Sequence, residues 1–362
     1  MEELELNNLK NIGMSAELNS LFNETYPDGL KLGRVALEHK HSYRVWLDEG
    51  EYLCTLAGKL TFEANGREDL PAVGDWVAVQ ASPGEMRGII KGILPRKSKF
   101  SRKAAGQVTE EQIVAANVDT VFIVNSLNDD LNLRRIERYL LLAWESGSNP
   151  VIVLSKADLV TDLQAKLDQV SSVAIGVPVI AVSVLEGKGI EDLQAYLTPG
   201  KTIALIGSSG VGKSSLVNYF TGFEKQLVQE IRESDDKGKH TTTHREMVRL
   251  PGGAILIDTP GMREIQLWTS EDGITESFAD IEEYADACKF RDCSHKNEPG
   301  CAVVSAIQEG LLEESRLVSY KKLQKELAFI DRKLDKKAQA DEKKHWKNIS
   351  KEARHNSMHK RR

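Results

Sequence analysis

Cysteine is scarce in this 362-residue sequence: there are four, and three of them, Cys288, Cys293 and Cys301, lie within fourteen residues of one another. That crowding favours a metal site over disulfides. Long apolar runs are missing too, and none approaches the ~18 residues that a membrane-spanning helix needs. The first residues are acidic where a secretory signal would be basic. We therefore expect a cytoplasmic protein with no membrane partner.

Basic residues are not in excess overall, because the formal net charge is −6, and this argues against a protein coated in positive charge. The last 32 residues differ from the rest of the chain because they are basic, with twelve Lys or Arg against five Asp or Glu. Such asymmetry predicts contact with a polyanion at one end of the chain. A solvated charged helix without a partner is the alternative for this tail taken alone.

The length predicts two or three domains. After a 32-residue extension to which we assign no chemistry, five short strand-like segments occur at residues 33–37, 43–47, 52–56, 75–79 and 87–90. They predict a small OB-fold β-barrel over residues 33–104. Such barrels bind nucleic acid through basic and aromatic residues, so Arg44, Trp46 and the basic run 96–103 are candidates. The alternative for Trp46 and Trp76 is a place in the core.

Residues 105–275 alternate between apolar strands and amphipathic helices, which is typical of a parallel α/β sheet. The expected strands lie at residues 118–124, 151–154, 179–182 and 202–206. In sheets of this kind the chemistry collects at the carboxyl ends of the strands. We therefore expect the functional residues directly after these segments.

A phosphate-binding loop follows the last of these strands. Backbone N–H groups must curl around phosphates without side chains in the way, which explains its glycines, and the start of the next helix adds a favourable dipole. Lys213 would neutralise the β- and γ-phosphates and Ser214 would bind magnesium. An ordinary Gly-rich turn is the alternative. The residues assigned here to nucleotide binding are Gly207, Ser208, Ser209, Gly210, Val211, Gly212, Lys213, Ser214 and Ser215.

The base is read elsewhere, because such loops accept ATP as readily as GTP. Ser155, Lys156 and Asp158 resemble the Asn-Lys-x-Asp motif of Ras-like GTPases, in which the Asp accepts two hydrogen bonds from guanine and the Lys lies along the ring. Ser155 replaces the usual Asn, which puts the contact to the far side of the base in doubt. A helix N-cap is the alternative for these residues. Ser183 and Val184 resemble the loop that closes over the guanine oxygen.

Two further segments resemble the switches of these GTPases. Asp258, after an apolar strand, would contact magnesium through water, and the N–H of Gly261 would meet the γ-phosphate. The first switch would lie at residues 238–243, where Thr242 would complete the magnesium shell, with Thr241 or Thr243 as alternatives.

Motif order is unusual, since the base motif at 155–158 precedes the phosphate loop at 207–214. Domains whose termini lie close together tolerate such circular permutation. Next comes Cys288-x4-Cys293-x-His295-x5-Cys301, three thiolates and an imidazole that suit a closed structural zinc site. Buried or unpaired thiols are the alternative.

Together, the barrel, the permuted motifs, the zinc-ligand spacing and the basic tail resemble the RsgA family of ribosome small subunit-dependent GTPases, over about residues 33–362. The resemblance implies a circularly permuted α/β P-loop GTPase domain with an N-terminal OB-fold barrel and a helical zinc-binding module at 276–362. It further implies a monomeric late maturation factor of the small ribosomal subunit, stimulated by that subunit and gripping its rRNA near the decoding region. GTP and GDP, magnesium and one zinc ion would be its ligands.

Hydrolysis is the least determined step. Met262 occupies the position where Ras-like enzymes carry the water-orienting glutamine, and an apolar side chain cannot do that. Slow intrinsic turnover is therefore predicted, with His240 as the candidate for positioning water. RNA binding or simple exposure is the alternative for His240.

Three rival functions remain open: an RNA-binding assembly protein for which nucleotide is only a structural ligand, an ATPase, and a GTPase acting on a protein. The tail carries an apolar helical stripe at Leu317, Tyr320, Leu323, Leu327, Ile330 and Leu334, which predicts packing against the protein. The basic end beyond residue 336 is expected to order on phosphate backbone.

Overall fold

A computed structural model describes residues 9–26, 29–39, 42–82, 84–103, 111–128, 131–222, 245–258, 278–291, 293–296, 298–312, 314, 316–318, 320–321 and 324–325. The chain divides into two compact units, residues 1–266 and 267–362, and each is described by itself. Domain boundaries after residues 32, 104 and 275 stay predictions. Among the described residues, no helix is both long and apolar enough to span a bilayer.

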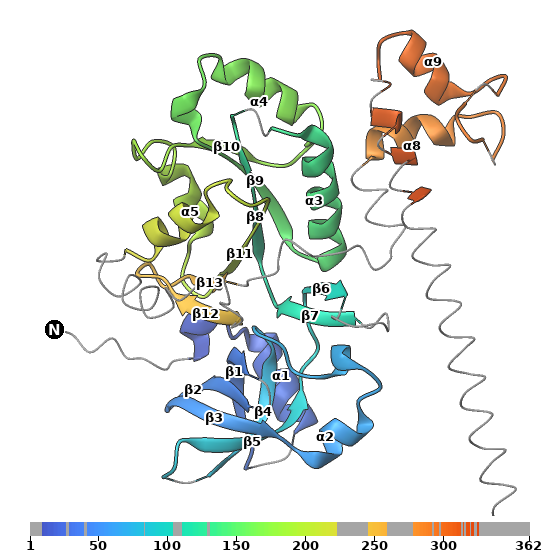
Figure 1. The fold of residues 1–362 in the computed structure, drawn as a ribbon. Helices are drawn as coiled ribbons and strands as arrows, with labels where there is room; N and C mark the ends of the chain where they lie inside the picture. Colours follow the sequence, from blue (N-terminus) through green and yellow to red (C-terminus); the bar gives the residue numbers. More distant parts are fainter. Residues whose placement is uncertain are drawn as a thin grey trace, which may run out of the picture. The chain divides into compact units, whose positions relative to one another are not determined.

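Alternation of apolar and polar residues in the first third of the chain produces a closed five-stranded barrel (Figure 1). Its inward side chains include Val35, Val45 and Ile90, all fully buried. The order β1-β2-β3-β5-β4, closed by β4 pairing with β1 and with β3 parallel to β5, is that of the predicted OB fold. The strands are β1 (Lys31–His39), β2 (Ser42–Leu47), β3 (Gly50–Leu56), β4 (Trp76–Ser82) and β5 (Arg87–Ile93).

The N-terminal extension packs against this barrel. Helix α1 (Ala16–Thr25) is capped by Ser15, whose hydroxyl accepts from the N–H of Leu18. Just beyond it, the Tyr26 hydroxyl donates to the carbonyl of Ile93 at 3.3 Å. The barrel leaves room for that ring, because a side chain at Gly92 would collide with Tyr26.

A parallel sheet with one antiparallel strand forms the rest of this unit. Its order is β10-β9-β8-β11-β13-β12, with only β12 antiparallel to its neighbour. Helices α3 (Leu133–Ser146) and α5 (Lys213–Phe220) lie on opposite sides of it (Figure 1). The other elements are β8 (Thr120–Ser126), β9 (Asn149–Ser155), α4 (Leu163–Ser171), β10 (Val179–Val182), β11 (Thr202–Ile206), β12 (Arg245–Arg249) and β13 (Ile255–Asp258).

The barrel and this sheet are joined through β12. Leu37 of β1 pairs with Glu246 of β12, so one continuous run of hydrogen-bonded strands crosses both parts. Arg249 of β12 lies over the ring of Trp46, 4.6 Å from its centroid. Trp46 therefore contacts the sheet from the barrel. Trp76 is buried in the core, as the alternative interpretation held.

Arg34 is buried at the same joint. Its guanidinium donates to the carbonyls of Ile12, Gly74 and Asn117, and it lies over the Trp76 ring. Burial lowers the pKa of Arg34 to about 10, although nearby Asp119 and Asp75 oppose the shift. One side chain thus ties the extension, the barrel and the sheet together.

The basic run 96–103 is only partly a surface feature. Arg96 forms an ion pair at 2.7 Å with the fully buried Asp75 and also donates to two backbone carbonyls. Residues Lys99–Lys103 form β6, which pairs with β7 (Glu111–Ala116) in a hairpin that periodicity did not predict. Of the basic run, Arg96 has a structural role.

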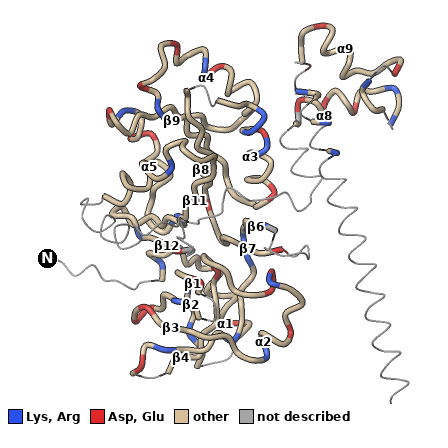
Figure 2. The backbone as a smooth tube through the Cα atoms, viewed as in Figure 1, with Lys and Arg blue, Asp and Glu red and all other residues tan. Residues whose placement is uncertain are grey.

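The described residues of the second unit include two short helices, α8 (Ala279–Asp286) and α9 (Ala302–Gln308), and the described residues at 314, 316–318, 320–321 and 324–325 are helical as well. Leu317 and Tyr320 of the predicted stripe are buried; its members from Leu323 onward lie outside the described residues. Basic and acidic residues are interspersed along the described chain (Figure 2). The basic excess after Asp331 also lies outside the described part.

Candidate functional site

The phosphate-loop residues connect β11 to α5, at the carboxyl edge of the sheet. Gly207, Gly210 and Gly212 all have positive φ, between 77° and 146°, a region that glycine enters without strain. A side chain at Gly207 would also collide with the carbonyl of Val124 on the neighbouring strand. The loop therefore needs glycine both for its curvature and for its approach to β8.

Lys213 folds back over the loop. Its ammonium donates to the carbonyl of Gly207 at 2.7 Å and to that of Ser208. Next along α5, Ser214 and Ser215 are exposed in the first turn. A cation, exposed hydroxyls and the N–H groups of a helix start thus converge at one point, an arrangement suited to phosphate.

The base motif lies two strands away at the same edge. Ser155 ends β9 and pairs in register with Val182 of β10, so the loops after β9 and β10 are adjacent. The Ser183 hydroxyl donates to Oδ1 of Asp158 at 2.6 Å. This bond leaves the other carboxylate oxygen for a base and holds the two predicted base-binding segments together.

Ser155 links the base motif to the phosphate loop. It is buried, and its hydroxyl donates to the carbonyl of Val211 at 2.6 Å; the carbonyl of Asn125 is 3.3 Å away. A hydroxyl has one hydrogen to donate. Ser155 therefore holds the loop and has no hydrogen left for the far side of the base.

Replacing Ser155 with Asn is expected to tighten GDP binding about three- to tenfold, the value of one net hydrogen bond. The amide has two N–H donors, one for Val211 and one for the base. Fluorescent GDP titration checks this. Ser155→Ala is the matched control and should weaken binding, because it removes the bond to the loop. Unchanged affinity in both variants would contradict the role given to Ser155.

The predicted switch residues flank β12 and β13. Asp258 ends β13 and pairs with Glu246 of β12, so it lies beside the start of the strand that follows the predicted first switch in the sequence. His240, Thr242 (with Thr241 and Thr243), Gly261 and Met262 lie outside the described residues. Their roles stay predictions.

Two residues at this edge escaped the sequence reasoning. Arg135, in the first turn of α3, donates through Nη1 to the Ser208 hydroxyl at 2.7 Å. Asn125, near the end of β8, is fully buried, and its amide has no hydrogen-bond partner within the described parts of the chain. The one available signal was a polar pair, Asn125 and Ser126, closing the apolar run of β8.

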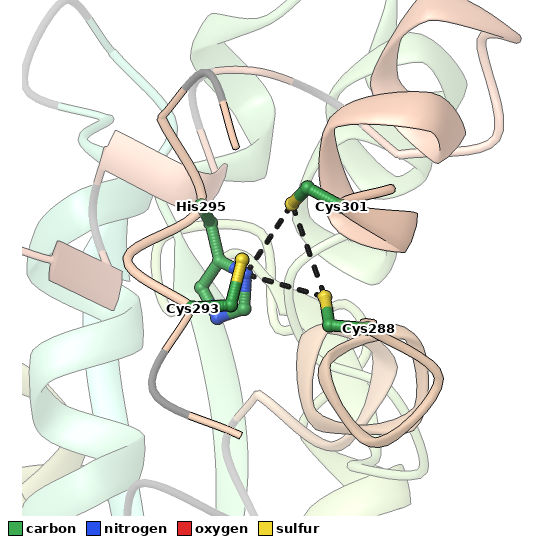
Figure 3. A group of neighbouring side chains, drawn as sticks. All are labelled: Cys288, Cys293, His295 and Cys301. Carbon is green, nitrogen blue, oxygen red and sulfur yellow. Dashed lines mark hydrogen bonds between the residues drawn. The ribbon is translucent and has the colours of Figure 1, made fainter. Parts of the chain in front are cut away.

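The cysteine and histidine cluster lies wholly in the second unit, and its four side chains lie close together (Figure 3). The ligand atoms of Cys288, Cys293, His295 and Cys301 are all within 4.8 Å of one another. Nδ1 of His295 is 3.6 Å from Sγ of Cys288 and 3.5 Å from Sγ of Cys301, and these two sulfurs are 3.9 Å apart. A tetrahedral zinc ion with ordinary bond lengths would separate its ligand atoms by about 3.5–3.8 Å. The donor set and its spacing fit such an ion.

Local surroundings shift the pKa values of the two thiols Cys288 and Cys293 in opposite directions. Burial raises the pKa of Cys288, but the N–H groups of Val303 and Ala302 at the start of α9 outweigh it, so the net shift is downward. For Cys293, the N–H of His295 lowers the pKa, yet burial and the neighbouring thiols prevail and raise it to about 11. Burial lowers the pKa of His295, which favours the neutral imidazole that binds metal.

Comparisons with known proteins agree with this arrangement. A family model described as RsgA GTPase matches residues 93–268, and one described as 50S ribosome-binding GTPase matches residues 202–337. A protein of Opitutus terrae named small ribosomal subunit biogenesis GTPase RsgA is 45% identical over 325 residues, 87% of this chain and 89% of its own. A protein of Lactiplantibacillus plantarum, named small ribosomal subunit biogenesis GTPase RsgA 2, is 47% identical over 84% and 86% of the two chains.

Solved structures match the fold. The crystal structure of YjeQ from Thermotoga maritima superimposes with a TM-score of 0.62 at 31% identity, covering 83% of this chain and 99% of that one. The structure of YloQ, described as a circularly permuted GTPase, gives a TM-score of 0.61 at 25% identity over 85% and 98% of the two chains. The permuted order of the motifs is therefore a property of the fold.

Proposed function

The chain belongs to the RsgA family of circularly permuted GTPases, and from this premise we propose that it hydrolyses GTP in the biogenesis of the small ribosomal subunit, in contact with that subunit's rRNA. The observation that carries the proposal is 45% identity over 87% of the chain to a protein named for that role. The loop and base motif at one sheet edge support it, because Asp158 and Lys213 provide what guanine and phosphates need. We expect a cytoplasmic monomer.

Nucleotide would be held from both ends. Asp158 would accept the two donors of guanine, with Lys156 along the ring and the Ser183–Val184 segment closing over it. Lys213 would turn from the loop carbonyls to the β- and γ-phosphates. Ser214 and Thr242 would hold magnesium, whose charge offsets that of the phosphates; the exposed hydroxyl of Ser214 is a hard oxygen donor of the type magnesium prefers.

The second unit would carry one structural zinc. Three thiolates and one imidazole leave no open position for a substrate, so the ion would organise the chain around residues 286–302. Together with the basic end of the chain and the barrel, this module would form the rRNA-binding part of the protein.

The deciding experiment measures GTP and ATP hydrolysis by the zinc-loaded protein with and without small ribosomal subunits. Salt is held fixed, because binding to RNA phosphates depends steeply on it. Strong stimulation of GTP turnover alone is the expected result. Equal slow rates in all four conditions would favour the alternative, a nucleotide-stabilised RNA-binding assembly protein. If the affinity for subunits changed neither with salt concentration nor on deletion of the tail, a protein partner would be favoured.

Replacing His240 with Ala is expected to lower stimulated turnover about 10²-fold or more, the usual contribution of a positioned acid–base group, while GDP affinity stays unchanged. Stopped-flow turnover and GDP titration on the same preparation check both parts. Unchanged turnover would remove His240 from the mechanism.

A further inference from the structure

We propose that Arg135 is a positioning residue for the phosphate loop, holding its first half in place while Lys213 is engaged with nucleotide. The proposal rests on the GTPase function and adds a residue to its binding machinery. The contact that carries it is the 2.7 Å hydrogen bond from Nη1 of Arg135 to the hydroxyl of Ser208, the second residue of the loop.

The fold brings this guanidinium to the loop. Strand β8 pairs with β11 in parallel, with Ile123 opposite Ile206, so the segments that leave both strands emerge side by side. Helix α3 begins there, and the side chain of its N-cap Asn132 accepts from the N–H of Arg135 at 3.1 Å. The first helical turn is thus fixed, and the partly buried Arg135 side chain crosses to the neighbouring loop.

The loop has two anchors, one for each half. Ser155 holds the second half through the carbonyl of Val211, and Arg135 holds the first half through Ser208. Three glycines with positive φ make the backbone between Gly207 and Gly212 intrinsically free, so a closed loop loses conformational entropy. Anchors that fix the loop beforehand reduce that cost at the moment of binding.

Lys213 makes the first anchor necessary. Its ammonium holds the carbonyls of Gly207 and Ser208, and the same ammonium is the group that must reach the phosphates. When it leaves those carbonyls, the bond from Arg135 still holds Ser208. Arg135 therefore acts on the nucleotide-bound loop, through Ser208, and its loss should be seen in binding rather than in the chemical step.

The test is a double-mutant cycle on the full-length protein, using Arg135→Ala, Ser208→Ala and the double variant. Fluorescent GDP titration and steady-state GTP hydrolysis are the readouts. We expect Arg135→Ala to raise the Kd for GDP and the KM for GTP about tenfold, with kcat nearly unchanged. A tenfold change corresponds to the low end of the free energy that a hydrogen bond to a charged group contributes. Ser208→Ala should act in the same direction, and the double variant should be no worse than Arg135→Ala, because both single variants remove the same Arg135–Ser208 bond.

Arg134→Ala is the matched control: it removes the same charge from the same helical turn, but its side chain is exposed. Its affinity should equal that of the wild type, and Arg135→Lys, which keeps the charge but lacks the planar fork, should restore only part of the loss. The proposal would be overturned if the effects of Arg135→Ala and Ser208→Ala on GDP affinity added up in the double variant, or if Arg135→Lys bound GDP as tightly as the wild type. It would also be overturned if Arg135→Ala lowered only kcat, or changed neither binding nor hydrolysis. Wild-type protein that neither binds nor hydrolyses GTP would instead overturn the proposed function.

Discussion

Replacing Asp158 with Asn is expected to weaken GDP binding by roughly 100-fold or more and to make the protein accept xanthine nucleotides. Two charge-assisted hydrogen bonds to guanine are lost, each worth about 1.5–3 kcal/mol, and 1.4 kcal/mol is a factor of ten. Competition of GDP, XDP and ADP against a fluorescent nucleotide measures the exchange of preference.

The direction of this change follows from the contact with Ser183. Its hydroxyl donates to Oδ1 of Asp158, so an Asn at this position keeps its carbonyl oxygen there and turns its NH2 group toward the base. Guanine presents N–H donors to that group and is repelled, whereas xanthine presents a carbonyl. The bond to Ser183 therefore predicts that Asp158→Asn changes the preferred base from guanine to xanthine and does not only lower the affinity for GDP.

Asp162→Asn is the control for Asp158→Asn. Asp162 caps α4 a few residues away, through the N–H of Ala165 at 3.1 Å, and Asn caps a helix equally well. This variant loses the same charge from the same segment and should bind GDP as the wild type does. Equal weakening of GDP and XDP by Asp158→Asn would show that the carboxylate supports the fold rather than reading the base.

Local patterns predicted the parts of the site that are contiguous in the chain. The strands at 179–182 and 202–206 have the predicted bounds, and the cysteine and histidine spacing closes into one cluster. For each strand the signal is a short apolar run that can be recognised without knowing its partners, and for the cluster it is a set of ligands that are close in sequence. The ligand set in particular spans only fourteen residues of chain, from Cys288 to Cys301.

Features that depend on distant partners were not predictable in this way. Strand β12 (Arg245–Arg249) has the sequence Arg-Glu-Met-Val-Arg, in which charged residues hide the strand, and it is defined by pairing with β1 and β13. An arginine is usually exposed, but Arg34 is buried, and its guanidinium donates to three carbonyl groups from separate segments of the chain. The Arg135–Ser208 bond joins residues 73 apart. Single-chain periodicity carries no information on such pairs.

Replacing Cys301 with Ser is expected to abolish zinc binding and to unfold the described part of the second unit, while GDP binding stays as in the wild type. The hydroxyl of Ser is a poor zinc ligand, and structural zinc sites contribute apparent binding energies of about 10–16 kcal/mol that are at the same time folding energy. Metal content by mass spectrometry and hydrogen exchange over residues 278–325 measure the two effects.

Ser is the informative substitution because Cys301 has a second role. It is the N-cap of α9, and its sulfur accepts from the N–H of Val304 at 3.5 Å. Since Ser is a favoured N-cap, the variant keeps the helix start and loses only the metal ligand. Cys54→Ala, which removes a buried thiol of the barrel, is the control and should leave zinc content and exchange in the second unit unchanged.

Acidification should have the same effect as the substitution. Zinc requires deprotonated thiols and a neutral imidazole, so bound zinc is retained at neutral pH and is lost as the pH falls and protons compete for the ligands. Contacts that do not involve the metal also join the described residues of this unit: Arg316 pairs with Asp280, Tyr320 donates to Glu282, and the ring of Phe278 packs against that of Tyr320. If the Cys301→Ser variant still protects residues 278–325 from exchange, these contacts suffice without metal and zinc is not what folds the unit. The opposite result is that residues 278–325 lose all protection from exchange when zinc is absent, and that added zinc restores the protection in the wild type but not in the Cys301→Ser variant. That result would show that the metal provides the folding energy of this unit.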